Sequence, residues 1–166
     1  MSSQEAPPVA ETVQPVSFTA PVAPPSNLIF GILAGGVAAV IGALVWAGIA
    51  YATEMVIGYI AIGVGFLVGL AIRRFGRGSS ATFGVAGAVL ALAGCILGDL
   101  LAGVAMASKQ SGVAMVTIFQ SLPPDIVLEM LKEQEPMGWV IYGIAVFAGF
   151  KYSTLPTAPA EQPAAA

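Results

Sequence analysis

The chain has 166 residues and a formal net charge of −3, with 57% hydrophobic residues and only 9% charged ones. Soluble domains carry about 25% charged residues, so this composition excludes an ordinary soluble surface and favours lipid as the solvent. The chain contains no histidine, which is the commonest general base and metal ligand. Its six Lys and Arg residues form no basic stripe of the kind that binds nucleic acid.

Proline-rich tails flank the apolar part of the chain. Residues 1–27 and 153–166 are rich in Pro and Ala, and such segments bury too little apolar surface to offset the entropy of ordering them. We predict that both tails are disordered. Residues 28–152 are predicted to form one all-α domain, a small transmembrane helical bundle.

Four apolar runs are predicted to be membrane-spanning helices. They cover residues 28–52, 54–72, 82–106 and 137–152. The first run exceeds the ~20 residues that cross a bilayer core, whereas the last reaches only about 24 Å. Three spans are therefore the alternative to four.

Polar residues mark the expected helix starts. Asn27 or Ser26 would cap the first helix, and Thr53 would cap the second after a very short turn. These two helices are therefore expected to form a tight antiparallel hairpin. Ser79 or Ser80 would cap the third helix.

The segment 107–136 carries charges that the apolar runs lack. Pro123 and Pro124 suit the start of a short helix. Its apolar face would comprise Ile126, Val127, Met130 and Leu131, and its polar face Asp125, Glu129, Lys132 and Glu133. This amphipathic pattern is typical of a helix at the membrane interface. Trp46 and Tyr51, near the end of the first span, are predicted to be interfacial aromatic residues.

Basic residues predict the orientation in the membrane. Arg73, Arg74 and Arg77 follow the second span, and short cytoplasmic loops carry an excess of Lys and Arg. Four spans then place both tails in the cytoplasm. The three arginines set this topology, and they could also contact anionic lipid headgroups.

Glycines four residues apart recur on three of the predicted helices. The pairs are Gly31 and Gly35, Gly65 and Gly69, and Gly94 and Gly98. Such spacing lets a second helix approach closely. The partner helix could belong to this same bundle, or to another membrane subunit or a second copy of the chain.

Asp99 is the ionisable residue well inside a predicted span, and intramembrane carboxylates are functional candidates. It lies toward the outer end of its helix, so it could instead be hydrated at the interface or paired with Lys109. Glu54 is expected on the same side of the membrane. Asp99 and Glu54 are therefore a candidate polar site for a proton or a cation.

The sequence contains no recognisable catalytic or cofactor-binding pattern. It has no C-x-x-C, no phosphate-binding glycine loop with lysine and no H-E-x-x-H. The single cysteine, Cys95, lies in an apolar run and is expected to be a packing residue. We therefore expect no enzyme activity, no cofactor and no metal.

Several stretches resemble one family of small bacterial multi-span membrane proteins that has no assigned activity. They are GYIAIGVGFLVGLAIRRFGRG at 58–78, FGVAGAVLALAGCILGDLLA at 83–102 and IYGIAVFAGFKYS at 141–153. The resemblance implies a four-span core in the bacterial inner membrane. In that family an amide commonly follows the glycine at the position of Asp99, which argues against a proton relay there.

Two functions remain open at this point. The first is a non-enzymatic structural or accessory membrane subunit that acts through helix–helix contacts in the bilayer. The alternative is a small oligomeric transporter or channel component in which Asp99 and Glu54 line the path, since four helices alone seldom enclose one.

Overall fold

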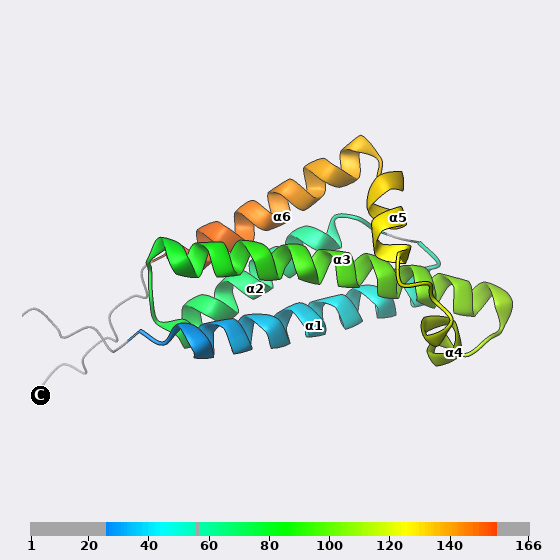
Figure 1. Ribbon diagram of the computed structural model, residues 1–166, viewed down its shortest axis with the longest axis horizontal. Helices are drawn as coiled ribbons and strands as arrows, with labels where there is room; N and C mark the ends of the chain where they lie inside the picture. Colours follow the sequence, from blue (N-terminus) through cyan, green and yellow to red (C-terminus); the bar gives the residue numbers. More distant parts are fainter. Residues whose placement is uncertain (1–25, 56, 156–166) are drawn as a thin grey trace, which may run out of the picture.

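The computed structural model describes residues 26–55 and 57–155, and this part of the chain forms six helices and no strands (Figure 1). The all-α prediction is confirmed. The helices are α1 (Leu28–Thr53), α2 (Ile60–Gly76), α3 (Ala81–Ser111), α4 (Met115–Gln120), α5 (Ile126–Glu133) and α6 (Pro136–Thr154).

Helices α1, α2, α3 and α6 form an up-and-down bundle (Figure 1). α2 and α3 contact each other, and both α1 and α6 pack against this pair. Short α4 and α5 lie at the end of the bundle where α1 finishes and α6 begins (Figure 1). We call this the open end. The other end, where α1 and α3 begin and α2 and α6 finish, is called the closed end.

The first helix begins where the sequence predicts. The Asn27 side chain accepts a hydrogen bond from the Phe30 backbone N–H at 3.2 Å, so it caps α1. The Asn27 N–H in turn donates to the Gly76 carbonyl at 2.8 Å, which ties the start of α1 to the end of α2.

The predicted start of the second helix is wrong. Helix α1 continues through Thr53, whose hydroxyl donates to the Ile49 carbonyl at 2.8 Å rather than capping a new helix. Glu54 ends α1 in the left-handed conformation, with φ 59°. Helix α2 begins only at Ile60. The connection is mostly apolar, so hydropathy alone does not distinguish it from the helices on either side.

The other helix ends extend beyond their predicted limits. Helix α3 runs to Ser111. It ends there because the next residue, Gly112, adopts the left-handed conformation of a helix C-cap, with φ 70°. Pro136 occupies the first turn of α6, which continues to Thr154. Ser153 is fully buried in that helix, so the prediction of a disordered tail from residue 153 is wrong there. The rest of both predicted tails, 1–25 and 156–166, lies outside the described residues.

Small residues bring the four long helices into close contact. All six paired glycines are buried. A Cβ on Gly65 would collide with the backbone of Ala145 in α6, and one on Gly98 would collide with the Trp46 ring in α1. The glycine pairs therefore pack within this chain, the first of the two interpretations above.

Two of the described helices, α1 and α3, are long and apolar enough to cross a membrane. Their outward faces support this, since Phe30, Leu33, Val37 and Val89 are all more than half exposed. A soluble monomer rarely exposes an apolar surface of this extent.

Candidate functional site: a polar cleft around Asp99

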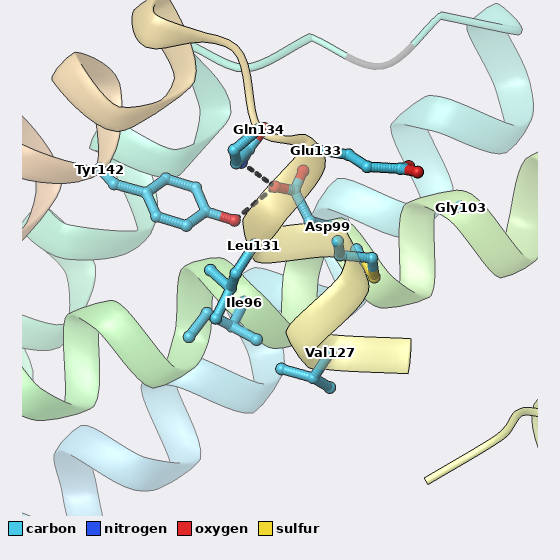
Figure 2. A pocket seen from close by; sticks show the side chains of 9 residues that line it. Ile96, Asp99, Gly103, Val127, Leu131, Glu133, Gln134 and Tyr142 are labelled. Atoms are coloured by element: carbon cyan, nitrogen blue, oxygen red, sulfur yellow. Dashed lines mark hydrogen bonds between the residues drawn. The ribbon is translucent and has the colours of Figure 1, made fainter. Parts of the chain in front are cut away.

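The carboxylate of Asp99 is held by side chains from different parts of the open end. The Tyr142 hydroxyl, from α6, donates a hydrogen bond to Asp99 Oδ2. The Gln134 amide, from the connection between α5 and α6, donates to the same oxygen at 3.1 Å. Figure 2 shows both donors converging on the carboxylate. Helix α3 thus supplies the acceptor, while the chain that returns to form α6 supplies both donors.

Asp99 lies between two adjoining hollows, and Asp99, Gln134 and Tyr142 line both of them. Their volumes are about 270 Å³ and about 450 Å³. Helix α5 covers the smaller hollow with its apolar side chains Val127, Met130 and Leu131.

The amphipathic pattern predicted for 126–133 is therefore confirmed, since Ile126, Val127, Met130 and Leu131 are half-buried while Glu129, Lys132 and Glu133 are exposed. Its location at a membrane interface remains a prediction.

Trp46 forms part of the wall of the larger hollow. It is only 1% exposed and packs against Gly98, so the prediction that it is an interfacial aromatic residue is wrong. Its indole Nε1 is buried and has no acceptor among the described residues. A buried donor without a partner is costly.

Glu54 does not take part in this cleft. Its carboxylate lies 2.9 Å from Lys109 Nζ, which also donates to the Tyr51 carbonyl at 2.9 Å. The Lys109 ammonium lies 5.1 Å from the centre of the Tyr51 ring. The suggested pairing of Lys109 with Asp99 is therefore replaced by a pairing with Glu54. The two predicted site carboxylates have separate partners, and neither hollow at Asp99 is lined by Glu54.

The predicted arginine cluster lies at the closed end. Arg74 and Arg77 line a hollow of about 420 Å³ with Asn27, Phe30 and Phe75. Arg73 and Arg74 occupy the last turn of α2, where positive charge interacts favourably with the helix dipole. Their contact with lipid headgroups remains a prediction.

Cys95 is fully buried in the core, and its thiol contacts the Ala61 carbonyl at 3.7 Å. This position agrees with the predicted packing role. Within residues 26–55 and 57–155 there is no cluster of three or more Cys, Asp or Glu side chains that could hold a metal ion.

Sequence reasoning identified Asp99 but missed its partners. Gln134 and Tyr142 follow it by 35 and 43 residues, and only the return of the chain through α5 brings them together. Comparison with known proteins adds nothing to this picture, since no family model, curated protein or solved structure matches the chain.

Proposed function

We propose that this protein is a non-enzymatic integral membrane protein that crosses the bilayer four times, with α1, α2, α3 and α6, and serves as a structural or accessory component. The apolar outer surface of the bundle carries this proposal. On α6, Val140, Ile144 and Phe147 are exposed, as are the outward residues of α1. Lipid chains would cover these side chains as effectively as a protein core does.

The arrangement of the helices supports four spans rather than two. Helix α2, with 17 residues, and α6, with 19, pack alongside α1 and α3. At 1.5 Å per residue they reach about 25 Å and 28 Å, close to the ~30 Å of a bilayer core. Helices packed side by side in one bundle lie at the same depth in the membrane. If α1 and α3 cross the bilayer, the shorter helices α2 and α6 would therefore cross it with them.

The distribution of charge supports the predicted orientation. Arg73, Arg74 and Arg77 lie at the closed end with Lys151, which is in the last turn of α6. The open end carries most of the acidic side chains. By the positive-inside rule the closed end faces the cytoplasm. The membrane would be the bacterial inner membrane, as the family resemblance implies, with both termini in the cytoplasm.

Contacts with another subunit would use the outward faces of the helices. The three glycine pairs are occupied within the chain, so they do not support the accessory role. Exposed residues such as Phe66 and Phe147 are available instead.

Labelling of single cysteines tests the topology. Cys95→Ala removes the one native thiol, and single cysteines are then placed at Ser79 in the closed-end loop and at Ser121 in the open-end loop. A membrane-impermeant thiol reagent applied to intact cells should label the Ser121→Cys variant and spare the Ser79→Cys variant until the cells are permeabilised. Labelling of both variants in intact cells, or of neither after permeabilisation, would contradict the four-span topology.

A second candidate function is a small oligomeric transporter or channel component, and the polar cleft at Asp99 is the observation that favours it. The centre of the bundle is filled by buried side chains such as Val64, Val68 and Ile72. Any path would therefore run between copies of the chain, and Glu54 would not share the Asp99 cleft. The mass of the purified complex separates this function from the accessory one, since a homo-oligomer without other subunits would favour transport.

A further inference from the structure

We propose that the Asp99 cleft binds a small organic cation, an ammonium group on a short carbon chain. This inference goes beyond the structural or accessory role and does not depend on it. It is based on the charges, the unpaired groups and the walls of the two hollows.

The cleft has negative charge without a compensating cation. Both donors to Asp99 are neutral, the hydroxyl of Tyr142 and the amide of Gln134. Both reach Oδ2, so Oδ1 accepts no hydrogen bond from the part of the chain that the structure describes. No described Lys or Arg lines either hollow. The nearby cation of α3, Lys109, is already paired with Glu54.

A half-buried carboxylate without a counter-ion attracts a cation more strongly than it would in water, because the surrounding dielectric is low. Ile96 and Leu131 form apolar walls beside Asp99 (Figure 2). The same figure shows the carboxylate of exposed Glu133 directed away from Asp99. This carboxylate adds to the negative potential without occupying the space beside Asp99.

The chemistry of the walls favours an organic cation over a metal ion. Metal ions require several closely placed ligands, and the described residues offer no such cluster. An alkylammonium group is instead stabilised by one carboxylate together with aromatic and apolar surface. Half-buried Ile96, Val127 and Leu131 provide apolar surface of this kind in the smaller hollow.

The charge at the cleft indicates which source of such a cation fits. Ethanolamine and choline are small ammonium compounds of this class. Glu133 and Glu135 would repel a phosphate, so the free amino alcohol is expected rather than a phospholipid headgroup.

Fluorescence of Trp46 gives a direct test. The chain has two tryptophans, and Trp139→Phe leaves Trp46 as the reporter in the cleft. The purified protein in detergent micelles is titrated with ethanolamine, with choline and with 3,3-dimethyl-1-butanol, the uncharged analogue of choline. We expect a saturable change with at least one of the two cations. The uncharged analogue and phosphoethanolamine should each bind at least about tenfold more weakly.

Matched variants locate the binding charge. In the Trp139→Phe background, Asp99→Asn keeps an acceptor for Tyr142 and should weaken cation binding by at least about tenfold. Glu54→Gln removes a carboxylate of the same end that is outside the cleft, and binding should be unchanged.

Four results would overturn the proposal. They are equal binding of the cation and the uncharged analogue, unchanged binding after Asp99→Asn, no saturable response to either cation, and tighter binding of phosphoethanolamine than of ethanolamine. If Asp99→Asn does not fold, the comparison of cation with uncharged analogue still decides. Because the titration is done in micelles, it succeeds or fails independently of the topology and of any partner subunit. Tighter binding of phosphoethanolamine would point to a lipid headgroup.

Discussion

The two ends of the bundle are built differently. At the closed end Phe83 is 4% exposed and packs against Gly31 and Gly76, and a backbone hydrogen bond from Asn27 joins α1 to α2. At the open end α4 and α5 contain no fully buried residue, and the hollows around Asp99 are not filled by side chains. Buried contacts therefore join the helices at the closed end, which has its own surface hollow at Arg74 and Arg77, whereas the polar site at the open end is incompletely packed.

Truncating a large side chain at each end should give the largest difference. Phe83→Ala removes a buried ring from the closed end and should lower the free energy of unfolding by about 3 kcal/mol, because the cavity it leaves cannot collapse between packed helices. Leu131→Ala removes a half-buried side chain of α5 and should cost less than about 2 kcal/mol. Unfolding in mixed micelles, followed by circular dichroism, measures both. Equal losses would mean that the open end is packed as tightly as the closed one.

Two glycines of α3 allow a matched test on one helix. Gly87 faces α6, where a Cβ would collide with Ser153 and the Gly149 carbonyl. Gly87→Ala should therefore destabilise the bundle by about 1–3 kcal/mol through overpacking. Gly103 lies beside the cleft with nothing within 4 Å of a Cβ.

The control, Gly103→Ala, should be neutral or stabilise the protein by up to about 1 kcal/mol, since alanine has the higher helix propensity. Thermal unfolding of the two variants compares them directly. A destabilising Gly103→Ala would show that the open end is closed more tightly than the structure indicates.

The sequence predicted the parts of the fold that depend on hydropathy and local capping. The helical character of 28–52 and 82–106, the Asn27 cap and the amphipathic face of 126–133 follow from residues close together in the chain. The start of α2 could not be found in this way, because the residues after Glu54 are as apolar as a helix of the bundle. The break there depends on the left-handed conformation of Glu54, a non-glycine residue, and glycine is the usual signal for it.

The candidate site was predictable only in its central residue. A carboxylate in an apolar run identifies Asp99 without any knowledge of the fold. The roles of Gln134 and Tyr142 depend on how α5 turns the chain back toward α3, which no local pattern specifies. Trp46 is a second case in which local sequence was not sufficient. A tryptophan near a span end suggests the interface, yet close packing against Gly98 buries it in the core.

The smallest expected effect concerns how the closed end is fastened. Asn27 and Ser80 both precede helices that begin at this end, but of these two only the Asn27 side chain donates or accepts a capping hydrogen bond in the described structure. Asn27→Ala should cost about 1 kcal/mol of stability, whereas Ser80→Ala should change it by less than about 0.5 kcal/mol. Thermal unfolding of both variants in the same detergent measures the difference. The Asn27→Ala variant keeps the backbone hydrogen bond from residue 27 to the Gly76 carbonyl and loses only the side-chain cap. Equal and small effects of the two variants would therefore mean that this backbone bond joins α1 to α2 without a contribution from the cap. A larger loss from Ser80→Ala would instead assign the main stabilising role at this end to the loop before α3.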